Sequence, residues 1–124
     1  MTNVYTNYKA NLSTVDLTTI YTVPTATTAV IKSIRVSNQD TENNCNISLF
    51  LVDSSGVSYP LEIDRNIQAK RSQELLSTGN MDQGSSDSSI GSPTPIIFKE
   101  TEILKAQAEN GNDLTVIISV LEIT

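Results

Sequence analysis

Hydrophobic and polar residues alternate along most of the chain, and β-branched residues fill many of the hydrophobic positions. A period of two residues is typical of β-strands with one buried face. No segment keeps the helical spacing of hydrophobic residues over several turns, so the pattern predicts no helix. The expected strands are 4–8, 18–23, 28–38, 45–53, 57–63, 96–98, 102–108 and 114–123, with shorter candidates at 66–70 and 72–76.

Turn residues separate these strand patterns. Pro24 lacks a backbone donor and ends the strand before it. The segment 53–56 (Asp-Ser-Ser-Gly) predicts a hairpin loop, and the segment 110–113 (Asn-Gly-Asn-Asp) predicts a second hairpin. Roughly eight or nine short strands at near-regular spacing are typical of all-β folds. We expect a single antiparallel β-sandwich, jelly-roll-like, over residues 1–124.

Alternation also predicts which face of each strand points to the core. In 28–38 the expected inward residues are Val30, Lys32, Ile34 and Val36. In 45–53 they are Cys45, Ile47, Leu49 and Leu51. In 114–123 they are Leu114, Val116, Ile118 and Val120.

Hydrophobic residues also occupy faces that are predicted to point outward. They are Phe50 and Val52 on one strand, and Ile117, Leu121 and Ile123 on another. Most outward positions of an isolated sandwich are polar, so these residues indicate burial against a neighbouring subunit. The alternative is cover by another part of the same chain, or a β-bulge that shifts the register.

The segment 77–95 is the longest stretch without a strand pattern, and it is rich in Ser, Gly, Asp and Pro. Loops of this length are usually functional or disordered, and in a particle subunit we expect such a loop to lie on a neighbour. The candidate contact residues in it are Asn80, Met81, Asp82, Ser85, Ser86, Asp87 and Ile90. Some of these side chains offer oxygen ligands for Ca²⁺, but their spacing does not match an EF-hand, and an ordinary surface loop is favoured.

Composition and charge narrow the possible chemistry. The chain has 124 residues, no Trp and a net charge of −6, which predicts one domain with an aliphatic core. Its cations are scattered, which argues against direct nucleic-acid binding. With no His and one Cys, catalytic triads and the usual zinc sites are excluded, and no phosphate-binding glycine motif is present. We expect neither an enzyme nor a cofactor, and we expect Cys45 to be a small buried residue.

The N-terminal residues are polar and lack the charged and apolar regions of a signal peptide. No apolar run approaches the ~20 residues that span a bilayer. We therefore expect synthesis in the cytosol and no membrane contact.

Five strand segments resemble a known group of proteins. They are 20–24 (IYTVP), 28–38 (TAVIKSIRVSN), 48–53 (SLFLVD), 103–108 (ILKAQA) and 116–124 (VIISVLEIT). These segments are similar to small accessory virion proteins of tailed bacteriophages, particularly cyanophages and other marine phages. The resemblance covers most of the chain outside 77–95. It implies a β-sandwich structural protein without catalytic residues, present on the virion as a head decoration, neck or tail component.

The first expectation for function is a capsid decoration or cement protein that binds several capsid subunits and resists their separation. Its partners would be the major capsid protein or another virion protein, and further copies of itself in a trimer or higher oligomer. A neck, tail or fibre-associated subunit of the same fold is the runner-up. A module that binds host glycans is a third alternative, for which the available aromatic residues are Tyr5, Tyr8, Tyr21 and Tyr59.

Overall fold

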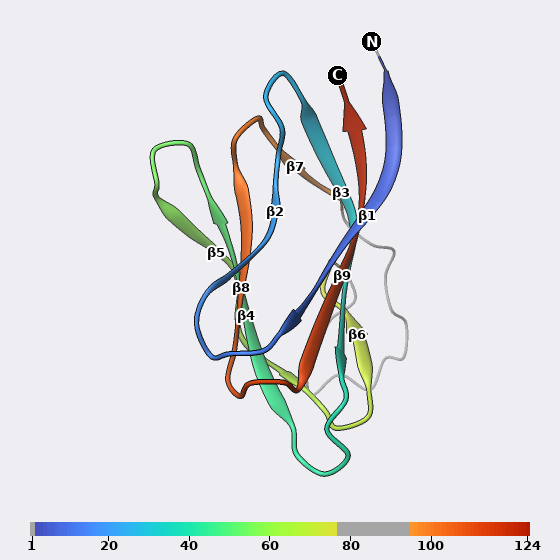
Figure 1. Ribbon diagram of the computed structural model, residues 1–124, viewed down its shortest axis with the longest axis vertical. Coiled ribbons are helices and arrows are strands. Elements are labelled where there is room, and N and C mark those ends of the chain that lie inside the picture. The colour runs from blue at the N-terminus through green and yellow to red at the C-terminus, as the bar shows by residue number, and fades with distance from the viewer. Residues whose placement is uncertain (1, 77–94) are drawn as a thin grey trace, which may run out of the picture.

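The computed structural model describes residues 2–76 and 95–124, and every regular element in these ranges is a β-strand. Nine strands in the described ranges form two antiparallel sheets (Figure 1), which confirms the predicted all-β sandwich. The strands are β1 (Asn3–Leu12), β2 (Thr18–Thr22), β3 (Thr28–Asn38), β4 (Cys45–Val52), β5 (Ser58–Ile67), β6 (Ser72–Glu74), β7 (Ile96–Phe98), β8 (Ile103–Ala108) and β9 (Leu114–Ile123).

The strand order is that of a jelly roll. Sheet A runs β1-β9-β3-β6, with β7 pairing with the first part of β3, and sheet B runs β2-β8-β4-β5. Apart from β7, the antiparallel pairs β1–β9, β2–β8, β3–β6 and β4–β5 are nested within one another, as in a long hairpin rolled into two sheets. Each sheet face is therefore assembled from strands that are far apart in sequence.

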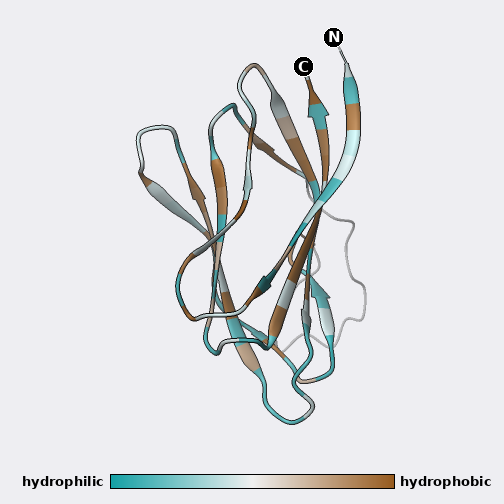
Figure 2. Cartoon of the chain, in the orientation of Figure 1, coloured by the Kyte–Doolittle hydropathy of each residue, from teal (hydrophilic) through white to brown (hydrophobic). Residues whose placement is uncertain are grey.

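Inward residues of both sheets form one aliphatic core. The four predicted inward residues of β9 are buried, and so are Cys45, Ile47 and Leu49 of β4, while Leu51 packs against the core from a partly buried position. Figure 2 shows hydrophobic residues recurring along the strands of both sheets, with largely hydrophilic turns between them. Cys45 is wholly buried, as predicted, and this burial raises the pKa of its thiol.

A β-bulge in β3 makes one predicted face partly wrong. Lys32 is an extra residue in the pairing of β3 with β9, so the alternation reverses at this point. Ile34 and Val36 point inward as predicted, whereas Val30 and Lys32 lie on the outer face. The prediction was wrong for these two residues because alternation alone assumes an unbroken register.

The predicted hairpin at 110–113 is also wrong. β8 belongs to sheet B and β9 to sheet A, so the connection crosses from one sheet to the other. Gly111 permits a close contact there, because a Cβ atom on it would lie 2.7 Å from the carbonyl oxygen of Ser13. Asn112, at a φ of 66°, donates its N–H to the carbonyl of Leu12 at 2.9 Å. The connection from β1 to β2 therefore packs against the connection from β8 to β9, and both cross from one sheet to the other.

The segment 53–56 forms the predicted hairpin between β4 and β5, with Gly56 at a φ of 86°. β5 is longer than predicted and includes the first residues of the 66–70 candidate. Its pairing with β4 shifts register at two places, and Asp64 adopts a φ of 50°. Shifts of this kind disrupt a sheet edge and re-aim its side chains.

Candidate interaction surface

A row of hydrophobic side chains crosses the outer face of sheet A. Tyr5 on β1 pairs with Leu121 on β9. Leu121 also pairs with Val30 on β3, which pairs in turn with Ile97 on β7. Directly paired residues lie on one face with Cβ atoms about 4.5–5.5 Å apart, so the row is continuous. Tyr5 and Ile97, at its ends, are 74% and 62% exposed, and we call these four residues the outer row.

The outer row is followed along the strands by a polar and then a cationic region. The next paired positions carry Asn7, Ser119 and Ser33, and the positions after these carry Lys9, Ile117 and Arg35. Ile117 is exposed between the two cations. The outer face of sheet A therefore changes from apolar to cationic along the strand direction.

The cations of this face are not neutralised by ion pairs within the described residues. The one ion pair found in residues 2–76 and 95–124 joins Arg65 to Glu62, on a different side of the sandwich. Within the described ranges, Lys9 and Arg35 each make one long side-chain hydrogen bond, of 3.3 Å, to a neighbouring polar side chain. Within the part of the chain that the structure describes, neither cation is in an ion pair, which leaves both charges for a partner to neutralise.

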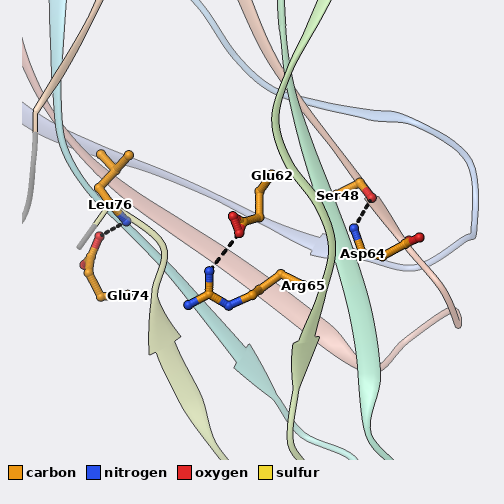
Figure 3. A network of polar contacts seen from close by, with 6 residues as sticks. All are labelled: Ser48, Glu62, Asp64, Arg65, Glu74 and Leu76. Atoms are coloured by element: carbon orange, nitrogen blue, oxygen red, sulfur yellow. Dashed lines mark hydrogen bonds and ion pairs between the residues drawn. The ribbon is translucent and has the colours of Figure 1, made fainter. Parts of the chain in front are cut away.

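Glu74 is an acidic residue beside this region, because it pairs with Arg35 between β6 and β3. Its carboxylate accepts hydrogen bonds from the hydroxyl of Ser33 and from the backbone N–H groups of Ile34 and Leu76, the last of which is drawn in Figure 3. These donors hold the carboxylate at the sheet edge. Among the described residues positive charge therefore predominates on this face, although the chain as a whole has a net charge of −6.

The outer face of sheet B changes from apolar to acidic. Phe50 and Ile103, both half-buried, lie on it near one end. Near the other end is a cleft of about 440 Å³, in which the carboxylates are Asp64 and Glu109, and we call it the acidic cleft. Its lining residues are Val15, Asn46, Ser48, Asp64, Gln107, Ala108 and Glu109.

The irregular backbone of β5 places Asp64 at this cleft. Its N–H donates to the hydroxyl of Ser48 at 3.0 Å, and Ser48 is itself buried. Figure 3 shows the Asp64 side chain on the opposite side of β5 from the Glu62–Arg65 pair. A left-handed conformation at a bulge is thus what turns this carboxylate toward the outer face.

The candidate contact residues predicted from sequence are found in different settings. Leu121 lies in the outer row, Ile117 is exposed in the cationic region, and Ile123 is half-buried on the same face. On sheet B, Phe50 is half-buried, but Val52 is only 9% exposed and offers little surface to a partner. The predicted residues Asn80, Met81, Asp82, Ser85, Ser86, Asp87 and Ile90 lie outside the described residues.

The four tyrosines do not share a cleft. Tyr21 is buried, and the hydroxyls of Tyr8 and Tyr21 both donate to the carboxylate of Glu122. Tyr5 and Tyr59 are exposed, but they lie on different sheets. The glycan-binding alternative therefore lacks the common aromatic platform that it predicted.

Sequence reasoning missed three of the four residues of the outer row. Alternation within 3–12 places Tyr5 on the face of the strand away from that of the inward Leu12. Ile97 precedes the buried Phe98 and so lies on the outward face, which means that the local pattern indicated both outward positions. Their alignment depends on the pairing of β1, β9, β3 and β7, which are far apart in the chain.

No group of three or more His, Cys, Asp or Glu side chains in the described residues is arranged to hold a metal ion. The oxygen ligands considered for Ca²⁺, at 80–87, lie outside those residues. Within the same described ranges, no helix is long and apolar enough to span a membrane.

Comparison with protein-family models, with curated proteins and with solved structures finds no match. The candidate surface is therefore defined by the residues of this chain alone.

Proposed function

We propose that the chain is a non-enzymatic structural subunit of a tailed-phage virion, with a capsid decoration or cement protein as the first candidate. The outer row carries this proposal, because contiguous apolar side chains on an outer sheet face fit burial against another protein. The resemblance of the strand segments to accessory virion proteins supports the assignment to a tailed phage. The jelly roll does not select it, since viral capsid domains, lectins and cupins share that architecture.

A decoration protein acts through buried area that is repeated by the symmetry of the particle. A subunit that contacts several neighbours must release all of them before they separate, which raises the resistance of the lattice. The outer row would supply an apolar centre and Lys9 and Arg35 a polar margin, which is the usual anatomy of a protein interface. The partner is then the major capsid protein or another virion protein, and the location is the virion.

A neck, tail or fibre-associated subunit is the second candidate. The observation in its favour is the difference in charge between the outer faces of the two sheets, cationic on one and acidic on the other. Unlike faces suit a contact that is repeated from copy to copy around a ring.

The copy number on purified virions tests the proposal. Quantitative mass spectrometry of particles from the phage that encodes the chain should find it at a level comparable to the major capsid protein if it decorates the head. A number matching a single ring would support the neck or tail candidate instead. Absence of the chain from purified virions would refute both.

Paired variants test whether the outer row mediates attachment. Tyr5→Ser with Ile97→Ser removes its two most exposed members and should abolish attachment to virions, while the fold is retained because both side chains are largely in solvent. Val57→Ser with Ile63→Ser is the matched control, since these exposed residues, at 47% and 57%, lie outside the outer row. Equal attachment of both double variants would contradict the role of the outer row.

A further inference from the structure

The outer faces of the two sheets each have an apolar end and a charged end, and the apolar ends lie at the same end of the sandwich. The 109–113 connection joins the end of β8, where the acidic cleft lies, to the start of β9. The cationic region lies near that start, and the outer row lies near the other end of β9 (Figure 1). On sheet B, Phe50 and Ile103 lie at the end away from the cleft. The apolar residues of the two faces thus lie at one height along the strands, and the cations of sheet A lie at the same height as the acids of sheet B.

The charges on these faces are complementary. Sheet A presents Lys9 and Arg35, with the exposed Lys32 of the bulge on the same strand as Arg35. Glu74 lies beside Arg35, but its carboxylate is engaged by three hydrogen bonds at the sheet edge. Sheet B presents Asp64 and Glu109, whose carboxylates form no ion pair within the described residues. Among the described residues, Lys105 is a cation on this second face, and it lies beside Phe50 at the apolar end rather than in the cleft.

We infer that the outer face of sheet A binds the outer face of sheet B on a second copy of the chain, so that copies assemble head to tail. When a second copy is displaced along the normal to the sheets without rotation, the outer row of one copy lies over Phe50 and Ile103 of the other. The same movement places Lys9 and Arg35 over the acidic cleft. The inference rests on the proposed function and deepens it, because the virion protein that it names as the partner of the outer row is a second copy of this chain.

A symmetric contact between two copies of sheet A is less favourable. A two-fold axis parallel to the strands would place Lys9 and Arg35 of one copy against the same cations of the other. A two-fold axis across the strands would place these cations against the outer row. Either arrangement leaves unpaired charge in the contact, which costs free energy.

The size of the faces is sufficient for a specific contact. Strands about 4.8 Å apart that rise about 3.3 Å per residue give a flat footprint of roughly 600 Å² for sheet A and roughly 450 Å² for sheet B, whose strands are shorter. Specific interfaces bury about 800 Å² of accessible surface per partner, and side-chain relief adds to the flat value. A contact that joins unlike faces closes into a ring or extends as a row.

Charge reversal on one face at a time tests this inference. One variant carries Lys9→Glu and Arg35→Glu, and the other carries Asp64→Lys and Glu109→Lys. Lysine is acceptable at the left-handed position of Asp64, since Lys70 holds a φ of 63° in this chain. Circular dichroism checks that both variants keep the β-sheet signal. Glu42→Lys with Lys70→Glu is the control, because it reverses two charges outside both faces.

Sedimentation velocity at low salt and high concentration gives the readout. The unchanged chain and the control should form species larger than a dimer that dissociate as salt is added, because the contact is partly electrostatic. Each face variant alone should remain monomeric, because its two faces carry like charge. An equimolar mixture of the two should again form species larger than a dimer, because each variant complements the other at both faces.

Three results would overturn the inference: an unchanged chain that stays monomeric, a mixture that stops at two chains, or a cleft variant that associates as the unchanged chain does. These results are separable from the test of the proposed function. A chain that assembles in solution but is absent from virions would refute the function and leave the inference standing. A monomeric chain that is present on virions would refute the inference alone.

Discussion

The two open sides of the sandwich, where the edges of the sheets approach each other, are closed by different polar groups. On the side of β1 and β2, which we call the tyrosine side, two tyrosines hydrogen-bond one carboxylate. On the side of β5 and β6, which we call the arginine side, an arginine contacts a carboxylate and an amide. The first includes one buried side chain, that of Tyr21, whereas every polar side chain of the second is partly in water. The same number of polar groups should therefore contribute unequally to stability.

On the tyrosine side, Glu122 lies on the inward face of β9. Its Oε2 accepts hydrogen bonds from the hydroxyl of Tyr8 at 2.9 Å and from that of Tyr21 at 2.6 Å. The two rings contact each other, with centroids 4.4 Å apart, and Tyr21 is only 3% exposed. The carboxylate therefore joins strands β1 and β9 of sheet A to β2 of sheet B.

On the arginine side, Arg65 of β5 joins sheet B to β6 of sheet A through Gln73. Its Nη1 lies 2.7 Å from Oε1 of Glu62, and the two side chains are 26% and 23% exposed (Figure 3). With the amide oxygen of Gln73 turned toward the guanidinium, that oxygen accepts from Nε at 3.2 Å and from Nη2 at 2.6 Å. Hydrogen bonds to a charged group are worth more when enclosed, whereas exposed ion pairs contribute little.

Replacement of Glu122 by Ala should have the largest effect. It removes the acceptor of two hydroxyls and leaves that of the buried Tyr21 without a partner, so we expect a loss of about 2–3 kcal/mol in the free energy of unfolding. Urea denaturation followed by circular dichroism measures this loss. Glu122→Gln keeps an acceptor and should cost less. Equal losses for both variants would show that the hydrogen bonds are not the cause.

Replacement of Gly111 by Ala should follow closely, because it disturbs the crossings that continue the tyrosine side. A Cβ atom would lie 2.7 Å from the carbonyl oxygen of Ser13, so a backbone segment must move. We expect a loss of about 1–3 kcal/mol, in the range of packing strain. Gly56→Ala is a useful comparison, because it meets no atom within 4 Å and is strained only by its φ of 86°. A Gly111→Ala variant as stable as the unchanged chain would contradict the close contact of the crossings.

High pH should weaken the tyrosine side specifically. Burial first, and then Glu122, raise the pKa of Tyr21 and Tyr8 above the ordinary value of 10.0. The folded state keeps these protons where the unfolded chain loses them, so the stabilisation is complete below about pH 10 and decreases as the pH rises further. The slope should reach about 1.4 kcal/mol per pH unit for each tyrosine that stays protonated.

Urea unfolding at a series of pH values between about 8 and 11 measures this slope. Tyr21→Phe removes one of the titrating groups and should make the slope smaller. A Tyr21→Phe slope equal to that of the unchanged chain would show that Tyr21 is not linked to unfolding.

The extent to which sequence predicted these features depends on the distance between the interacting residues. Strand positions and the 53–56 hairpin follow from local pattern and were predicted. Glu122 stands at an inward position of an alternating strand, but its partners Tyr8 and Tyr21 are 114 and 101 residues away. The local sequence does not identify these hydrogen-bond donors, so it does not explain why a carboxylate occupies an inward position.

The outer row and the bulge at Lys32 show the same limit on the outer face. Leu121 was predicted to point outward, because alternation within β9 is regular. Val30 was predicted to point inward, because the extra residue that reverses β3 leaves no mark in the hydrophobic pattern. The wrong hairpin at 110–113 has a related cause: Asn-Gly permits a tight connection, but which sheet receives the next strand is decided by the nesting of the whole chain.

Replacement of Arg65 by Met should have the smallest effect. Met keeps much of the aliphatic stem but loses the contacts to Glu62 and Gln73, and we expect a loss of about 0.5–1 kcal/mol because these groups are partly in water. The contribution should shrink further as salt screens the pair. Glu62→Gln, which removes only the charge, should account for part of the loss. If Arg65→Met costs as much as Glu122→Ala in parallel urea denaturations, the ranking of the two sides by enclosure is wrong.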